Sequence, residues 1–436
     1  MLRGDILGGL QGAHATFGDV VDVQIGATRF HFVSSPAGVE HVLVKNRYNY
    51  RKSNVTKRAK PLLGNGLFTN DGESWRTQWR LMRPAFHQPQ IANLTTTMAA
   101  TIGEMLERWE QGAWCVKQTD GEQPTGDFDL SAELNHLSIQ IMMRGLFGSA
   151  ISAETAREIT DALTYLHSLF QQRALMPFEW ISRIPLPPNK KAQPTLDMLD
   201  ATLFEIIVKQ RQTVSPNNHL LALLIAAQDE ESGIGMSDQQ LRDEVMTLFV
   251  TGCETTASHL QWTLWLLDQN PAWRARLSAE IDTNLTGRTP TMADVPQLTI
   301  TRQIINESLR LYPPAWILGH RAINRDSLLR YDIQPGTTII MSPYVLHRHP
   351  DLWKTPDKFN PHRFADTAMR PRFAYWPFGG GSRQCVGDQF ALLGSTLTLA
   401  MIHQQYSVQI ESNNVEPLPS LTLRPKKPLL ATLKPK

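Results

Sequence analysis

One cysteine stands in a loop whose composition suits a reactive or metal-binding thiolate. Cys385 lies in FGGGSRQCVG (378–387), where four glycines and one arginine surround it, and an apolar helical segment follows. Because Gly has no Cβ, such a loop lets the backbone approach a bulky planar ligand closely. Free N–H groups and the helix dipole stabilise a thiolate that sits just before a helix N-terminus. The thiolate could be a nucleophile, a redox group or a metal ligand.

The surroundings of Cys385 narrow these roles. No local pattern supplies the base that a catalytic nucleophile needs, and Cys115 and Cys253 are far away in sequence, so no zinc-type ligand set is formed. A single axial thiolate is what haem iron needs, and thiolate donation favours O–O bond cleavage. A buried, inert cysteine in a turn is the alternative, which the glycines and Arg383 make the weaker one.

The cysteine loop resembles the haem-binding loop FxxGxRxCxG of the cytochrome P-450 superfamily. The matching residues are Phe378, Gly381, Arg383, Cys385 and Gly387. The resemblance implies that Cys385 is the axial ligand of haem b and that Arg383 neutralises a haem carboxylate. It also implies haem contacts from neighbouring positions, namely Pro377, Gly379, Val386 and Ala391.

A charged pair upstream supports the resemblance. Glu307 and Arg310 stand three residues apart in a predicted helix and therefore share a face. A bare ExxR is usually a solvated pair, but this one precedes LYPP and the cysteine loop, as in the family. There the pair joins an arginine of a PxRF element, which NPHRF supplies here as Arg363. The resemblance implies a buried charge network that holds the core around the cysteine loop.

The long predicted helix 242–271 carries TGCETTA, which resembles the oxygen-activation motif of the family. Gly252 matches the groove for dioxygen, Glu254 the acid and Thr255 the alcohol. Oxygen activation needs two protons, which a carboxylate can relay and an alcohol can guide through a held water. The alternatives are a surface charge for Glu254 and a hydrogen bond from Thr255 to the carbonyl of residue 251. Thr251 stands where the family commonly has Ala or Gly, which predicts a different distal hydration.

Other segments resemble the propionate-binding parts of the family. DGESWRTQWRLMRPAFH matches the WxxxR helix, with Trp75 in place and Trp79 where the arginine is expected. Trp79 can donate one N–H bond but supplies no charge. Arg80 follows it and is expected either near this site or facing another way, and core packing is the alternative for both tryptophans. Arg321 in LGHRAINRD matches a further propionate-binding arginine.

Family topology implies a mostly apolar distal pocket, which favours a lipophilic substrate. Segment 167–181 is expected to form a lid, in which Arg173 could meet a substrate carboxylate or simply be solvated. Core packing competes with the pocket role at each position. The residues expected to line the pocket are Leu67, Phe68, Leu248, Thr251, Trp316 and Ile317.

The composition is that of a globular protein with nearly balanced charge. Hydrophobic residues make up 42% and charged residues 19% of the 436, and 43 basic against 41 acidic residues leave a net charge of +2. This balance argues against a nucleic-acid partner, and no window is apolar enough for a membrane helix. Three cysteines exclude a disulfide framework and favour a reducing, cytoplasmic compartment.

Hydrophobic periodicity predicts a mostly α-helical chain with a minor β part. The resemblance implies a single P-450 catalytic domain over 1–436, a helix-rich triangular prism with small sheets, whose N-terminal part, about 17–70, is β-rich. A hairpin is expected at 20–35 and further β pieces at 327–346 and after 407. Helices are expected at 92–111, 137–148, 195–212, 220–228, 242–271, 301–312 and 387–406.

The resemblance implies a haem-thiolate monooxygenase that inserts one oxygen atom of O₂ into a lipophilic molecule, such as a terpenoid, a fatty acid or a polyketide-like compound. ESLRLYPP is similar to the fatty-acid-hydroxylase and microsomal branch. A separate ferredoxin or flavodoxin, with its reductase, is expected to supply electrons on the cysteine side of a monomer. The alternatives are a haem-thiolate peroxygenase, isomerase or dehydratase, which intact Glu254 and Thr255 disfavour, and a non-enzymatic haem sensor or carrier.

Overall fold

A computed structural model describes residues 5–25, 28–113, 128–148, 151–174, 187–212, 219–365 and 370–436. Its longer helices are α1 (Ile6–Phe17), α5 (Gly72–Met82), α7 (Thr95–Glu110), α8 (Leu130–Phe147), α9 (Ala153–Ala174), α10 (Pro187–Gln212), α12 (Asp238–Asp268), α13 (Pro271–Leu285), α14 (Thr299–Leu311) and α16 (Asp388–Gln405). Shorter ones are α2 (Pro36–Glu40), α3 (Asn54–Lys57), α4 (Lys60–Leu63), α6 (Gln88–Asn93), α11 (Leu220–Ala226), α15 (Pro343–Leu346), η1 (His41–Lys45), η2 (Arg47–Asn49), η3 (Arg83–Phe86), η5 (Val295–Gln297), η6 (Pro361–Phe364) and η7 (Gly381–Arg383).

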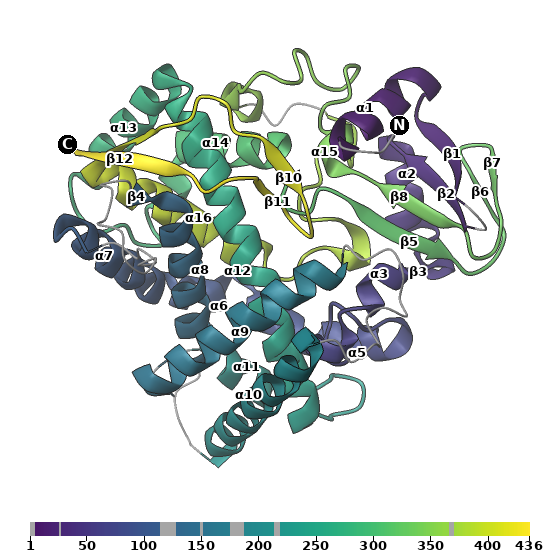
Figure 1. Cartoon of the computed structure of the whole chain (residues 1–436), viewed down its shortest axis with the longest axis horizontal. Helices are drawn as coiled ribbons and strands as arrows, with labels where there is room; N and C mark the ends of the chain where they lie inside the picture. The colour runs from purple at the N-terminus through teal and green to yellow at the C-terminus, as the bar shows by residue number, and fades with distance from the viewer. Residues whose placement is uncertain are drawn as a thin grey trace.

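The strands form small sheets beside the helices. They are β1 (Val20–Ile25), β2 (Thr28–Val33), β3 (Tyr50–Lys52), β4 (Phe128–Asp129), β5 (Leu318–Ala322), β6 (Asp326–Leu328), β7 (Tyr331–Ile333), β8 (Thr338–Met341), β9 (Tyr406–Ile410), β10 (Pro417–Pro419), β11 (Leu423–Pro425) and β12 (Leu430–Pro435). The largest sheet has the order β1-β2-β8-β5-β3 and lies on one side of the molecule, opposite α7 and α13 (Figure 1). In it, β2 and β8 are parallel and the other neighbours are antiparallel.

The predicted mostly α-helical fold is confirmed, and so is the hairpin of β1 and β2. Two local predictions are corrected. The end of the predicted β stretch 327–346 is the short helix α15, because Ser342 caps it and Pro343 fits its first position. The part from about 17 to 70 is not β-rich alone, since α2, α3 and α4 interrupt its strands, and its sheet is completed by β5 and β8 from much later in the sequence.

Helix α12 runs through the centre of the molecule and packs most extensively against α8 (Figure 1). Its start is fixed by a capping box, in which the Ser237 hydroxyl accepts from the Gln240 backbone while the Gln240 side chain accepts from the Ser237 N–H. Residues 241–250 and 257–264 are buried. None of the described helices combines the length and the apolar character that crossing a lipid bilayer requires.

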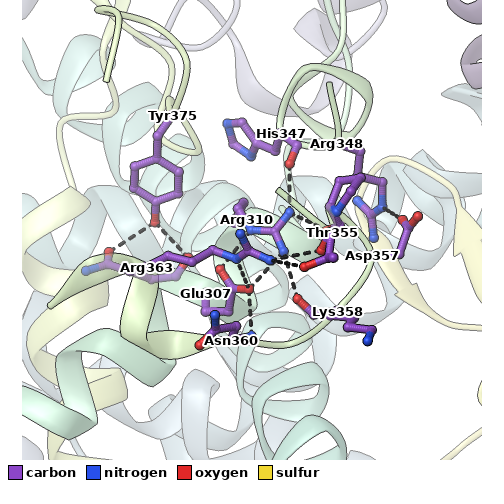
Figure 2. Close-up of polar contacts among 12 residues, drawn as sticks. Glu307, Arg310, His347, Arg348, Thr355, Asp357, Lys358, Asn360, Arg363 and Tyr375 are labelled. Atoms are coloured by element: carbon purple, nitrogen blue, oxygen red, sulfur yellow. Dashed lines mark hydrogen bonds and ion pairs between the residues drawn. The ribbon is translucent and has the colours of Figure 1, made fainter. Parts of the chain in front are cut away.

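A buried ion pair joins α14 to the segment that follows α15 (Figure 2). Glu307 and Arg310 are both fully buried, and the guanidinium reaches the carboxylate through Nε and Nη2, each at 2.8 Å. The remaining N–H groups of Arg310 go to backbone carbonyls of His347 (2.7 Å), Pro356 (2.7 Å) and Lys358 (3.3 Å). These three carbonyls are held in fixed positions because each accepts from the same rigid, planar guanidinium group.

Glu307 is satisfied from the other side as well. Its Oε1 accepts from the Asn360 N–H at 2.9 Å and from Arg363 Nε at 3.2 Å, and Arg363 continues to the Thr355 carbonyl at 2.9 Å (Figure 2). The structure therefore brings Glu307, Arg310 and Arg363 together. A buried ion pair is tolerated only when its other donors and acceptors are also paired, which these contacts achieve.

From this network, hydrogen bonds lead toward the cysteine loop. Burial lowers the pKa of His347 well below its ordinary value, so its ring is neutral, and Nε2 accepts from the Trp376 N–H at 2.9 Å. The Trp376 carbonyl in turn accepts from the Gly379 N–H at 3.0 Å. The position of Arg310 is thus relayed to the entry of the loop that carries Cys385.

We predict that Arg310→Lys lowers the free energy of unfolding by about 3–5 kcal/mol, because one ammonium cannot pair the carboxylate and three carbonyls together. Urea unfolding followed by circular dichroism measures the loss. Arg325→Lys is the matched control, since the Arg325–Asp332 pair is exposed and screened by solvent, so its loss should leave the free energy of unfolding nearly unchanged. Equal effects of the two substitutions would contradict the structural role of Arg310.

Buried histidine predicts acid sensitivity. Burial lowers the pKa of His259 in α12 to about 3, and its Nε2 is buried without a hydrogen-bond partner. Below pH 6.5 the unfolded chain binds a proton that the folded chain excludes, so stability falls on acidification. His259→Leu should remove up to about 2 kcal/mol of the loss between pH 6.5 and pH 5. Urea midpoints at both pH values test this, with the exposed His362→Gln as control; an unchanged slope in His259→Leu would contradict it.

Candidate active site

The cysteine loop is a tight turn between η7 and α16. The Cys385 N–H donates to the Phe378 carbonyl at 2.8 Å, which closes the loop, and Gly379 and Gly381 adopt φ values of +72° and +63° that favour glycine. The Cys385 side chain is exposed, yet burial raises the pKa of its thiol to about 11, while the Gly387 N–H opposes this shift. The thiol is thus accessible although protein atoms surround it, and binding a metal ion would replace its proton.

The glycines of the loop are needed for contacts within the protein. A Cβ on Gly381 would lie 2.3 Å from the Leu43 carbonyl oxygen of η1, and one on Gly380 would lie 2.2 Å from the Phe373 ring. At Gly387 a Cβ would meet nothing within 4 Å. The expectation that glycines bring the backbone close to a ligand is therefore corrected for Gly380 and Gly381, which make room for neighbouring protein. Pro377 is buried, and Phe378, Val386 and Ala391 are half-buried near the thiol in sequence.

The centre of α12 is the exposed part of an otherwise buried helix. Thr251, Gly252, Thr255 and Thr256 are half-buried, although the turns before and after them are buried. Positions 251 and 255 form one row on this side of the helix, and positions 252 and 256 form the next row. This half-buried face carries three hydroxyl groups between two buried stretches of the helix.

The three hydroxyls on this face donate to carbonyls of their own helix. Thr251 Oγ1 donates to the Thr247 carbonyl at 2.7 Å, Thr255 Oγ1 to the Thr251 carbonyl at 2.9 Å, and Thr256 Oγ1 to the Gly252 carbonyl at 2.9 Å. The back-bonded alternative for Thr255 is thus the observed geometry. Each hydroxyl oxygen still has lone pairs that can accept a hydrogen bond from a water or a ligand. Thr251 does not project a free donor, so its departure from Ala or Gly adds an acceptor and a methyl group.

Gly252 lies at the edge of this face that packs on α8, and Glu254 lies beside a cation. A Cβ on Gly252 would lie 2.3 Å from Met142 Cε of α8, so the glycine lets these two helices approach closely. Glu254 is mostly buried, with 13% side-chain exposure, and its Oε1 lies 3.9 Å from Arg424 Nε in β11. Glu254 is therefore not the plain surface charge of the alternative interpretation, and a cation from the C-terminal hairpin lies beside it.

A cluster of cationic side chains surrounds Trp75. The guanidinium of Arg383 lies 4.4 Å from the ring centroid and pairs through Nη2 with Asp71, and Lys52 Nζ lies 5.7 Å from the same ring. His320 is buried opposite Lys52 in the pairing of β3 with β5. Burial, with the charges of Arg383 and Lys52 adding to it, lowers the pKa of His320 to about 4.

This cluster fits a ligand that bears carboxylates. Arg383 Nη1 and His320 Nδ1 are buried without a hydrogen-bond partner, and Asp71 is the carboxylate that pairs with Arg383. Buried polar groups without partners are costly unless a ligand meets them, and a carboxylate can accept from the Arg383 guanidinium and from the N–H of a neutral histidine. The propionates of haem are such groups, and the same loop that carries Arg383 presents the Cys385 thiol two residues later. The residues present therefore fit haem.

The structure separates the other predicted propionate residues. Trp75 is buried in the cluster and stacks on the half-buried Trp79 with centroids 6.4 Å apart. Arg80 faces another way, since its Nε donates to Asp229 at 2.8 Å. Arg321 does not join the cluster: its side chain is exposed and donates to the Gly336 carbonyl at 3.0 Å. Side chains alternate along a strand, so His320 is the residue of β5 that faces inward.

Sequence reasoning missed Lys52, Asp71 and His320. The alternation of inward and outward side chains along the strand that contains Arg321 is the signal that could have identified His320. No local pattern marks Lys52 or Asp71, because they meet Arg383 through contacts that span more than 300 residues of the chain.

The predicted pocket residues fall into two groups. Leu67 and Phe68 are half-buried and pack on the main core, with Leu248 of α12 buried in that core. Trp316 belongs instead to a separate small core, and its indole N–H donates to the Ser420 carbonyl at 2.9 Å. The pocket role of Trp316 is thus corrected to core packing, with half-buried Ile317 packed against it. In the expected lid, residues 175–181 lie outside the described residues, as does the side chain of Arg173.

Comparison with known proteins agrees with this geometry. The cytochrome P450 family profile matches residues 3–433. Cyclooctat-9-en-7-ol 5-monooxygenase of Streptomyces melanosporofaciens is 33% identical over 93% of this chain and 84% of its own. Pentalenene oxygenase of Streptomyces avermitilis is 33% identical over 93% and 88%. The crystal structure of the cytochrome P450DA haem domain superposes with a TM-score of 0.86 at 25% identity, over 99% of this chain and 94% of that one.

The family match covers nearly the whole chain, and the structural match agrees with it. Enzymes of this family carry a haem whose iron is ligated by a cysteine thiolate, take a lipophilic substrate and O₂, and receive electrons from a redox partner. The chain belongs to the cytochrome P450 family and is a monooxygenase.

Proposed function

We propose that this monooxygenase oxygenates a terpenoid, a lipophilic hydrocarbon or one of its alcohols, with Cys385 as the thiolate ligand of haem b. The two relatives named above act, by their names, on an unsaturated alcohol and on pentalenene. One observation carries the proposal for this chain: a single loop presents both an accessible thiol and the unpartnered guanidinium nitrogen of Arg383. These are the two kinds of group that a haem needs, at its iron and at its carboxylates.

Bound haem would supply the activation of dioxygen, which thiolate donation favours. The protein contributes the surroundings. Arg383, Trp75 and His320 would hold the propionates, with His320 in the place that the family motif gives to Arg321. The Phe378 carbonyl orients the cysteine through its N–H, and the Glu307–Arg310 pair fixes the entry of the loop.

Proton delivery is proposed for the half-buried face of α12. The Thr255 oxygen would accept a hydrogen bond from a water and so hold it, while its own O–H donates to the Thr251 carbonyl. Glu254 would exchange protons with solvent on the side of Arg424, whose positive charge favours its carboxylate form. Thr251 would hold a second water through its oxygen, since its own O–H already donates to the Thr247 carbonyl.

We further propose that the enzyme is one catalytic domain over 1–436, acts as a monomer in the cytoplasm and receives electrons from a ferredoxin or a flavodoxin. The scarcity of cysteine supports a reducing compartment. The second candidate, a peroxygenase or isomerase on the same fold, is favoured only if Thr255 and Glu254 prove dispensable. A haem sensor or carrier would show no turnover with any substrate.

We predict that the reduced carbon monoxide complex shows the strongly red-shifted Soret band of thiolate ligation, and that Cys385→Ala abolishes it. Cys253→Ala is the matched control, because that cysteine is buried in α12 and should leave the spectrum unchanged. A Soret band at the position typical of histidine ligation in the unsubstituted protein would contradict the assignment of Cys385.

We predict that Thr255→Ala lowers the product formed per electron consumed by about 10-fold, within the usual range for loss of a proton-transfer group. The measurement uses a surrogate ferredoxin system and a substrate selected by spin-state shift from a panel of terpenoids, fatty acids and polyketide-like compounds. Thr256→Ala is the control, because its hydroxyl lies one residue further along α12. An unchanged yield of product per electron in Thr255→Ala would favour the peroxygenase alternative. A spin-state response to fatty acids alone would overturn the terpenoid proposal.

A further inference from the structure

Two ionisable side chains, the buried Glu244 and the half-buried Lys52, hold the backbone of Leu67 through its N–H and its carbonyl. The Leu67 N–H donates to Glu244 Oε2 of α12 at 2.9 Å. Lys52 Nζ, at the end of β3, donates to the Leu67 carbonyl at 2.6 Å and to the Phe68 carbonyl at 3.0 Å. The segment with the expected pocket residues Leu67 and Phe68 is therefore connected both to the sheet and to the central helix.

The Glu244 end of this connection is shielded from water. Glu244 is fully buried, and its second oxygen, Oε1, has no hydrogen-bond partner. Burial raises the pKa of Glu244 to about 8 and lowers that of Lys52 to about 7. In either protonation state the Glu244 carboxyl offers an oxygen to the Leu67 N–H, and Lys52 offers an N–H to the two carbonyls, so the segment stays connected at both points.

The same segment lies directly beside the hydroxyl-bearing face of α12. A Cβ on Gly66 would lie 2.2 Å from Thr247 Oγ1 and 2.5 Å from the Asp243 carbonyl, so the backbone touches the helix there. Thr247 is one turn before Thr251, and its carbonyl accepts a hydrogen bond from the Thr251 hydroxyl. The half-buried side chains of Leu67 and Phe68 thus project from a backbone that is fixed one to two turns from the residues proposed to guide protons.

We infer that Lys52 and Glu244 are positioning residues that set substrate selectivity by fixing the Leu67–Phe68 backbone beside the reaction space. The inference rests on the proposed function for the location of that space. Neither side chain needs to touch the substrate. The pair acts through the place at which it holds two apolar side chains, so its loss widens the range of shapes accepted more than it lowers haem binding.

The first test measures hydrogen exchange in peptides that cover residues 64–70 of the haem-loaded protein. Glu244→Met and Lys52→Met should each speed exchange by at least 10-fold, whereas Glu244→Gln, which keeps an acceptor, should change it less than 3-fold. Lys60→Met is the matched control, because the Lys60 ammonium meets this segment at the exposed Asn65 side chain and not at a backbone carbonyl of Leu67 or Phe68, and it should leave exchange unchanged. Unchanged exchange in both Met variants of the pair would overturn the inference.

The second test titrates the ferric protein with imidazole and with 4-phenylimidazole, which differ by one ring, and follows the absorption shift. The ratio of the two dissociation constants should change at least 5-fold in Glu244→Met and Lys52→Met and stay constant in Lys60→Met. Faster exchange with a constant ratio would overturn the role in selectivity. If Glu244→Met fails to fold, Lys52→Met carries both comparisons.

The two tests separate this inference from the proposed function. Absence of the red-shifted carbon monoxide band in the unsubstituted protein would defeat the haem-thiolate assignment, while the exchange measurement would still report on the pair. A normal band in every variant, together with unchanged exchange and an unchanged ratio, would defeat the inference alone.

Discussion

Arg310 uses all five N–H groups of its guanidinium inside the protein, two on Glu307 and three on backbone carbonyls. The carbonyls belong to residues 347, 356 and 358, so one side chain fixes a stretch of irregular backbone that has no sheet or helix to satisfy it. His347 passes this position to Trp376, and the turn at Gly379 follows from there. The placement of the thiol therefore depends on a buried ion pair that never touches it.

A second set of ionisable side chains fixes the segments around Trp75 and beside α12. Glu244 and Lys52 meet the backbone beside α12, and Arg383 meets Asp71 beside Trp75. The partners of Glu244 and Arg383 lie 177 and 312 residues away in the sequence, so the fold supplies them only when it is complete. These polar contacts fix the segments near the cysteine loop and α12, while the apolar core around α12 and α8 provides the rigid background on which they act.

The sequence analysis was most successful where a local pattern decides the structure. The 3.6-residue periodicity located α12, α14 and α16 to within a few residues, and glycine spacing located the cysteine loop. It was weaker where long-range contacts decide. Arg321 was chosen by motif, but strand alternation turns it outward and turns His320 in. Trp316 looked apolar enough for a pocket, and only the Ser420 carbonyl, about 100 residues later, shows that it belongs to a small core.

The topology of the largest sheet has a consequence for synthesis on the ribosome. Strand β2 ends at Val33, but its parallel partner β8 begins at Thr338, about 300 residues later. At roughly 5–20 residues per second, the β1–β2 hairpin waits about 15–60 s for that neighbour to emerge. The separate three-stranded sheet forms later still, because its central strand β12 lies at the C-terminus and pairs with both β4 and β9. During that interval the open edge of the hairpin can pair with other chains, so expression at lower temperature with chaperone support should favour the native yield.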